Sequence, residues 1–198
     1  MHVTVLDYGV GNLHSLTKAL AAAGGSTMVV SDARQALEGD LLVLPGVGAF
    51  PAAATHLAPS RDSLARAIAG GHPTLGICLG MQLFFESSAE GAGWGLGVLE
   101  GAVERLSAER LPQIGWNLVE PGGEPLLGRS GLQYVYYANS FACRPHDQSI
   151  VSAWSTHEHD RFAAVVRRGR TIGVQFHPEK SSAPGVAFLR AVLEELAS

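Results

Sequence analysis

The 198-residue sequence has few cysteines, few charged residues and no long apolar run, and each shortage excludes a class of protein. Two cysteines, Cys78 and Cys143, cannot build the disulfide framework of a small secreted domain. Charged residues make up 16% of the chain, and the net charge of −4 does not favour binding to nucleic acid or to an anionic membrane surface. Because no run of about 18 apolar residues is present, we expect no segment that spans a bilayer.

The remaining composition is typical of a globular protein. Hydrophobic residues make up 46% of the chain, which is enough for a buried core in a protein of this length. At about 150 residues per domain, residues 1–198 are predicted to form one domain. The first residues lack the cationic and apolar segments of a signal peptide, so we expect a cytoplasmic protein.

Short apolar segments alternate with helical patterns in the first half of the chain. Strands are predicted at residues 3–8, 27–30, 41–44 and 74–77. Helices are predicted from residue 13 to Gly24 and at residues 34–38 and 62–69, with a further helix beginning at 81–85. Apolar strands that alternate with helices are typical of a parallel sheet buried on both faces.

The second half is dominated by extended segments. Strands are predicted at residues 102–106, 114–119, 133–141, 150–155, 162–166 and 172–176, before a closing helix at 185–196. The two halves together predict an α/β fold, a three-layer sandwich around a central mixed, mainly parallel sheet.

The strongest local motif is Gly76-Ile77-Cys78-Leu79-Gly80, between an apolar strand and an apolar helix. Glycines on both sides allow a sharp strand-to-helix turn that presents a nucleophile. The start of a helix favours the thiolate form of a cysteine, and the amide of Leu79 would point towards a developing oxyanion. The alternative is a structural cysteine beside glycines that only turn the chain.

A candidate base lies in Gln175-Phe176-His177-Pro178-Glu179-Lys180, directly after a predicted strand. A thiol nucleophile needs a base and a group that orients the base. Pro178 favours an extended conformation at His177, so that His177 and Glu179 would share a face and Glu179 could orient the imidazole. The alternative is a surface histidine beside a turn proline.

A glycine-rich loop, Pro45-Gly46-Val47-Gly48-Ala49-Phe50, follows another buried strand. Loops at the carboxyl ends of parallel strands gather around ligands, and the glycines would let the Val47 amide turn towards a site as a second oxyanion donor. The alternatives are an ordinary turn, or a phosphate-binding loop without its Lys and Ser/Thr.

Together these motifs resemble the class I, triad-type glutamine amidotransferases, which have a flavodoxin-like core. The resemblance rests on residues 76–80 with Gln82 and on His177-Pro178-Glu179. A finer pattern is similar to the glutaminase subunits of imidazole glycerol phosphate synthase. It comprises Asp7-Tyr8-Gly9-Val10-Gly11-Asn12, residues 45–50, Ile114-Gly115-Trp116-Asn117 and residues 175–181.

The resemblance implies a role for each matching residue. Cys78 would attack glutamine and form a thioester, His177 would act as base and acid, and Glu179 would orient His177. The Val47 and Leu79 amides would form the oxyanion hole. Substrate contacts would come from Gly46, Gly48, Gln82, Asn139 and Ser140. No metal or other cofactor is implied.

One departure from the family pattern and one unused cysteine stand out. The family commonly has His-Ser or His-Thr where this chain has Asn139-Ser140. Contacts made by the main chain would survive that change. Cys143 has no motif around it and is predicted to be a structural thiol.

The resemblance also implies a partner. The glutaminase subunit would form a heterodimer with a (β/α)₈-barrel cyclase, which uses the ammonia to make imidazole glycerol phosphate and an aminoimidazole carboxamide ribonucleotide in histidine biosynthesis. The residues expected to face this partner are Tyr8, Asn12, Trp116, Asn117, Tyr136 and Lys180. The resemblance implies that the glutaminase is activated when the partner binds its nucleotide, and we expect the Gly46–Val47 peptide to be the switch.

Two other functions remain open at this point. One is an amidotransferase subunit of a different synthase, such as that of the pyridoxal phosphate or anthranilate pathway. The other is a catalytically silent regulatory subunit of the same fold, which the intact Cys78, His177 and Glu179 disfavour.

Overall fold

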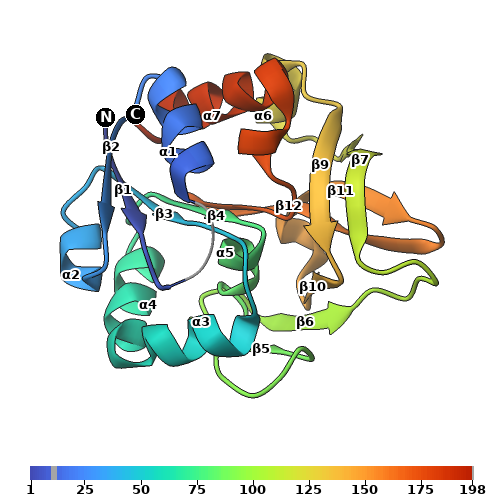
Figure 1. Cartoon of the computed structure of the whole chain (residues 1–198), viewed down its shortest axis with the longest axis horizontal. Helices are drawn as coiled ribbons and strands as arrows, with labels where there is room; N and C mark the ends of the chain where they lie inside the picture. The colour runs from blue at the N-terminus through green and yellow to red at the C-terminus, as the bar shows by residue number, and fades with distance from the viewer. Residues whose placement is uncertain (10–12, 198) are drawn as a thin grey trace.

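An eight-stranded sheet runs through the computed structural model, which describes residues 1–9 and 13–197 (Figure 1). Five parallel strands form one part of it, in the order β2 (Ser26–Val30), β1 (His2–Leu6), β3 (Leu41–Leu44), β4 (Thr74–Ile77) and β13 (Thr171–Val174). Three antiparallel strands continue it: β12 (Asp160–Arg168), β11 (Val151–His157) and β8 (Glu120–Pro121). The predicted mixed, mainly parallel sheet is confirmed.

Helices cover both faces of the parallel part (Figure 1). One face carries α1 (Leu13–Ala22), α6 (Pro125–Ser130) and α7 (Ser182–Leu196), and the other carries α2 (Ala33–Ala36), α3 (Phe50–Leu57), α4 (Arg61–Ala69) and α5 (Leu79–Gln82). The side chains of alternate strand residues point into two hydrophobic cores, one on each face of the sheet. Leu41 and Val43 of β3 pack into one core and Leu42 and Leu44 into the other, which is why the strand is apolar throughout. The three-layer prediction is confirmed.

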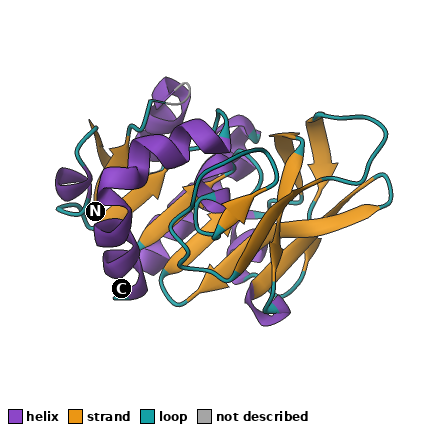
Figure 2. Cartoon of the chain, turned by 90° about the horizontal axis from the view of Figure 1, so that it is seen from below, coloured by secondary structure: helices purple, strands orange, loops and turns teal. Residues whose placement is uncertain are grey.

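Two smaller sheets lie beside the antiparallel part. One contains β10 (Phe141–Pro145), β6 (Gly101–Arg105) and β5 (Ser87–Ser88), and the other pairs β7 (Gln113–Leu118) with β9 (Tyr134–Asn139). Figure 2 shows strands dominating this end, while the helices gather at the other end. In the described part of the chain, three 3₁₀ turns complete the fold, at Ala58–Ser60, Gln148–Ile150 and Pro178–Lys180.

Several predictions about elements were wrong or incomplete, and helices α3 and α6 were not predicted. The helix expected to begin at residues 81–85 is α5, which starts earlier, because the chain turns directly after Cys78. The single strand expected at residues 133–141 is two strands, β9 and β10, separated at Ser140. Helix α3 was missed because its alanines give little contrast between an apolar and a polar face.

The parallel strands bring three segments to one edge of the sheet. Residue 45 follows β3, Cys78 follows β4 and Gln175 follows β13, all at carboxyl ends. Ligands of open α/β sheets bind at this edge. Within residues 1–9 and 13–197, no helix is long and apolar enough to cross a membrane, and no three His, Cys, Asp or Glu side chains are grouped to hold a metal ion.

Candidate active site

Cys78 occupies a strained turn between β4 and α5. Its φ of 51° and ψ of −105° lie outside the conformations that L-residues ordinarily adopt. The Cys78 amide donates to the Val174 carbonyl at 2.7 Å, which ties the turn to β13. The predicted sharp strand-to-helix turn at Cys78 is confirmed, and the role of Cys78 as nucleophile stays a prediction.

Glycines around this turn are required by close approach. A Cβ on Gly76 would lie 2.7 Å from the Gly80 carbonyl group and from the ring of Phe84. A Cβ on Gly80 would run into the carbonyl of Leu44, and one on Gly46 would run into the carbonyl of Ile77. The 45–50 loop therefore packs directly against the turn that carries Cys78.

His177 and Glu179 meet as predicted. His177 Nδ1 lies 2.8 Å from Glu179 Oε1, and the His177 side chain is only 1% exposed. Nε2 of His177, the ring nitrogen not bound by Glu179, is buried and remains for the interaction with Cys78. The contact with Glu179 arises differently from the expectation: His177 is extended, but Pro178 begins a 3₁₀ turn that folds Glu179 back.

Strand β9 holds the histidine in place from the other side. The His177 amide donates to the Tyr136 carbonyl at 2.8 Å, and the Ser181 hydroxyl donates to the His177 carbonyl at 2.7 Å. The Tyr136 amide in turn donates to Ser181 Oγ at 3.0 Å. Sequence reasoning missed the function of Ser181, although it lies within the matched segment at residues 175–181.

The electrostatics favour a protonated His177. Burial alone would lower its pKa, but the negative charge and hydrogen bonding of Cys78, followed by those of Glu179, raise the pKa of His177 from 6.5 to about 10. His177 is therefore an imidazolium at neutral pH, and its positive charge lies beside Cys78.

A cavity of about 200 Å³ opens beside the sulfur. Its walls include several predicted substrate residues together with residues that sequence reasoning did not select: Gly48, Cys78, Leu79, Gln82, Glu90, Pro112, Ala138, Asn139, Ser140 and Phe141. Glu90 and Pro112 were missed because no motif surrounds either. The Asn139 side chain is tied back to the Phe141 carbonyl, with Nδ2 donating at 3.0 Å.

The predicted oxyanion donors lie at the same place. Leu79 is the first residue of α5 and lines the cavity, and an amide at the start of a helix has no intrahelical partner. Val47 is half-buried between Gly46 and Gly48, and Gly48 lines the cavity with a φ of +134°. Their roles stay predictions.

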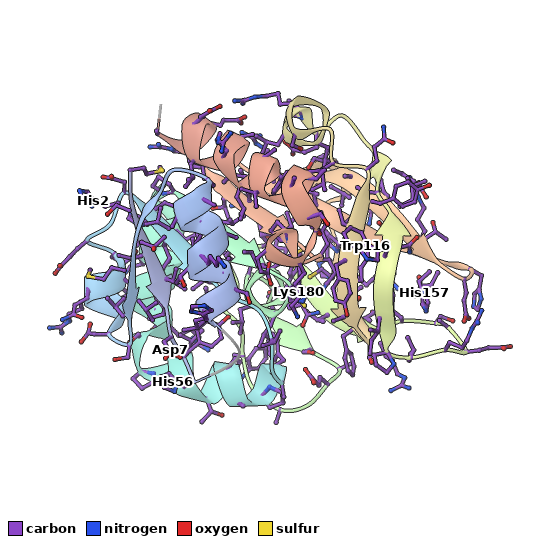
Figure 3. All side chains as sticks on the ribbon, turned by 45° about the horizontal axis from the view of Figure 1, so that its top comes forward. His2, Asp7, His56, Trp116, His157 and Lys180 are labelled. Carbon is purple, nitrogen blue, oxygen red and sulfur yellow. The ribbon has the colours of Figure 1, made fainter. Side chains whose placement is uncertain are left out.

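Three of the predicted docking residues form one cluster on the surface. The rings of Trp116 and Tyr136 meet edge to face, 6.3 Å between centroids, and Lys180 Nζ lies 5.6 Å from the centroid of the Tyr136 ring. Figure 3 shows Trp116 on β7 and Lys180 in the segment before α7, on the same side of the molecule.

Two docking assignments do not fit the structure, and a third lies outside the described residues. Tyr8 is 1% exposed, and its hydroxyl donates to the Pro45 carbonyl, so its side chain is not available to a partner. Asn117 points to the opposite face of β7 from Trp116, where its Nδ2 donates to the Thr156 carbonyl at 2.9 Å. Asn12 is the third.

Cys143 is fully buried and has a free thiol. Burial raises its pKa well above the ordinary value. The thiol is therefore held in its protonated form, as expected for a structural cysteine.

Comparisons with known proteins agree with this geometry. The family model for glutamine amidotransferase class-I matches residues 4–195. The imidazole glycerol phosphate synthase subunit HisH of Gloeothece citriformis is 40% identical, over 98% of this chain and 96% of its own length. The protein of the same name from Pyrobaculum aerophilum is 40% identical, over 98% of this chain and 97% of its own.

Solved structures show the same fold at lower identity. A glutamine amidotransferase crystal structure superposes with a TM-score of 0.77 and 22% identity, over 99% of both chains. A chain in the structure of PurLQS from Thermotoga maritima gives a TM-score of 0.72 and 19% identity, over 98% of both. By its match over residues 4–195 and its identity to the HisH proteins, the chain belongs to the class I glutamine amidotransferase family.

Proposed function

We propose that this chain is the glutamine-hydrolysing subunit of an imidazole glycerol phosphate synthase. The observation that carries the proposal is the arrangement of Cys78, His177 and Glu179 beside a cavity, in a chain about 40% identical to HisH proteins over nearly its whole length. The reaction releases glutamate and supplies ammonia to a cyclase subunit in histidine biosynthesis.

The first half of the reaction forms a thioester. The Cys78 thiolate adds to the carboxamide carbon of glutamine, and the resulting oxyanion accepts hydrogen bonds from the amides of Leu79 and Val47. The His177 imidazolium then gives its Nε2 proton to the departing nitrogen, the C–N bond breaks and ammonia leaves. Glu179 keeps the imidazole in the tautomer that this transfer needs.

The second half returns the enzyme to its starting state. Neutral His177 takes a proton from a water molecule as the water oxygen attacks the thioester carbon. The C–S bond breaks, and glutamate leaves as the thiolate and imidazolium are restored. Gln82, Asn139 and Ser140 line the cavity and are assigned to hold glutamine during both steps.

The strands β7 and β9 support a docking face for the cyclase, which we propose is a (β/α)₈ barrel. Alternate residues on one side of these strands are exposed and apolar: Ile114, Trp116 and Leu118 on β7, and Tyr134 on β9. Apolar surface of this kind marks interaction sites. Ammonia released near it would pass to the partner sheltered from water, which matters because free ammonia is mostly protonated at neutral pH.

The two open alternatives are less well supported. A silent regulatory subunit would have no use for a buried histidine that is oriented by Glu179 and charged beside Cys78. A subunit of another synthase is disfavoured by the identity to HisH proteins over nearly the full chain. The two free cysteines suit a reducing compartment, so we assign the enzyme to the cytoplasm.

Glutamate release tests the proposal directly. The purified chain is assayed with glutamine alone, with a cyclase subunit of imidazole glycerol phosphate synthase, and with that subunit plus its nucleotide substrate. We expect slow hydrolysis by the chain alone and strong stimulation by the loaded cyclase. Stimulation by an anthranilate or pyridoxal phosphate synthase partner instead would reassign the chain.

A further inference from the structure

Gln175 is completely buried at the reaction centre, and the steps above give it no function. Its Nε2 donates to the Cys78 sulfur at 3.5 Å, and its Oε1 accepts a hydrogen bond from Gln82 Nε2 at 3.2 Å. Gln82 Nε2 also donates to the Phe141 carbonyl at 3.1 Å. A continuous series of hydrogen bonds therefore joins the cavity wall to the nucleophile.

This series has only one consistent orientation. The Phe141 carbonyl can only accept, so the Gln82 amide must present its nitrogen to it. The same nitrogen faces Gln175, which must therefore present its oxygen to Gln82. What remains to face the Cys78 sulfur is the Gln175 NH₂ group, a donor. The direction of the last hydrogen bond thus follows from a backbone carbonyl two residues away along the series.

The strand that precedes Gln175 explains its placement. Successive residues of an extended chain point to opposite sides. Phe176 points into the core, where its ring meets those of Tyr137 and Phe188. Gln175 and His177, on either side of Phe176, both act on Cys78, one through the 3.5 Å hydrogen bond and the other through its charge.

We propose that Gln175 is a positioning residue that fixes the Cys78 sulfur and favours its thiolate form by donating a hydrogen bond to it. The proposal rests on the assignment of Cys78 as the nucleophile. A thiolate accepts a hydrogen bond much better than a thiol or a thioester sulfur does. The hydrogen bond therefore stabilises the Cys78 thiolate before it attacks glutamine. It stabilises the thiolate again when it leaves as the thioester is hydrolysed.

The test uses alkylation of Cys78 by iodoacetamide, followed from pH 5 to pH 10 by mass spectrometry of the Cys78 peptide. Gln175→Met keeps the length of the side chain and removes the donor. We expect the pH midpoint of alkylation to move upward by about one unit, and alkylation at neutral pH to slow about tenfold. The kcat for glutamine hydrolysis, measured in the complex with the cyclase, should fall by a similar factor with little change in KM.

Two further variants separate this effect from general damage. Gln113→Met makes the same substitution at another buried glutamine, one with no hydrogen bond to Cys78, and should keep the wild-type alkylation midpoint. Gln82→Met removes a residue of the cavity wall and also the donor that orients the Gln175 amide, but it keeps the Gln175 NH₂ group itself. It should therefore raise KM and move the alkylation midpoint less than Gln175→Met does.

A measurement on the wild-type chain covers the case in which Gln175→Met does not fold. The side-chain amide signals of Gln175 in an NMR spectrum should shift with pH at the midpoint of Cys78 alkylation, and should not shift in Cys78→Ser. An unchanged midpoint in folded Gln175→Met, or amide signals indifferent to Cys78, would overturn the inference. Glutaminase activity in Cys78→Ser would instead overturn the proposed function.

Discussion

The carboxyl edge of the parallel strands and the exposed side of β7 and β9 differ in almost every physical respect. At the edge, Cys78, His177 and Gln175 are buried and held by specific hydrogen bonds, with glycines packed around them. On β7 and β9, Trp116 is 54% exposed and Ile114 67% exposed, and their apolar surface faces solvent. One region is buried within the chain, and the other presents surface that a partner would cover.

The difference separates two tasks of the proposed enzyme. Chemistry needs groups fixed to within a fraction of an ångström, which a dense core with paired polar atoms provides. Association needs apolar surface that is exposed in the free chain and becomes buried when the partner binds. Substitutions at the edge should therefore change rates, whereas substitutions on the exposed side should change affinity for the cyclase.

The largest effect is expected from Cys78→Ser. A hydroxyl has far too high a pKa to be ionised in a site built for a thiolate, so glutamine-dependent turnover should fall at least about 10⁴-fold. Glutamate release measures it. The complex should still use added ammonium, because the cyclase reaction takes place on the other subunit. The control is Cys143→Ser, at a buried thiol that does not line the cavity, which should release glutamate at nearly the wild-type rate. An equal loss of glutamate release in both variants would contradict the assignment of Cys78 as the nucleophile.

The next largest losses of kcat are expected from substitutions of His177 and Glu179. His177→Asn removes base and proton donor together and should cost about 10³-fold in kcat. Glu179→Gln keeps the imidazole and should cost less, about 10- to 100-fold, because only orientation and charge support are lost. If the two variants were equally inactive at every pH, Glu179 would have a more direct part in the reaction than orienting His177.

Protein stability should depend on pH through the same pair. The pKa of His177 is raised from 6.5 to about 10 in the folded chain, so folding favours its protonated form. The stability from this group is fully present below pH 6.5 and is lost as the pH rises towards 10. The difference in free energy of unfolding between wild type and His177→Asn, measured with urea, should shrink over that range. A constant difference would show that His177 is neutral in the folded chain.

Loss of the second oxyanion donor should come next. Val47→Pro deletes one amide and should lower stimulated glutamate release about 10²- to 10³-fold, while glutamine still binds. Val47→Ala keeps the amide and controls for side-chain packing. Both are assayed with the cyclase, with and without its nucleotide. Full stimulation of a folded Val47→Pro complex would exclude this peptide as the switch.

A smaller effect is expected on the exposed side. Trp116→Ala should weaken binding to the cyclase roughly 10- to 100-fold, because buried aromatic anchors carry much of the energy of an interface. The melting temperature of the isolated chain should hardly change, since Trp116 is exposed there. A large drop in melting temperature with unchanged affinity would make Trp116 a structural residue of the β7 and β9 pair.

Local motifs predicted the turn at Cys78 and the contact between His177 and Glu179, because each is formed by residues close in sequence. Gly76 and Gly80 flank Cys78, and Pro178 lies between His177 and Glu179. The function of Gln175 could not be predicted in this way, because its partners are Cys78 and Gln82, both more than 90 residues away.

The docking assignments of Tyr8 and Asn117 do not fit the structure for a different reason. Trp116 and Asn117 are neighbours on one strand, so they cannot share a face, and the period of two could have excluded one of them. Tyr8 ends the strand predicted at residues 3–8 and precedes a glycine turn, a position typical of an exposed side chain. Only the fold shows that its hydroxyl reaches the Pro45 carbonyl.

The smallest effect is expected from Tyr8→Phe, which tests whether Tyr8 belongs to the buried edge or to the docking side. The substitution removes one hydroxyl and leaves the buried Pro45 carbonyl without it, at a cost of about 1–3 kcal/mol in the free energy of unfolding. Pro45 directly precedes Gly46, so the loop that packs on the Cys78 turn should loosen and kcat should fall a few-fold. Affinity for the cyclase should stay at the wild-type value, because the side chain is buried. Urea unfolding and a binding titration on the same preparation measure both quantities. Weaker binding with unchanged stability would return Tyr8 to the docking side, since only a residue that contacts the partner can affect binding without affecting the fold.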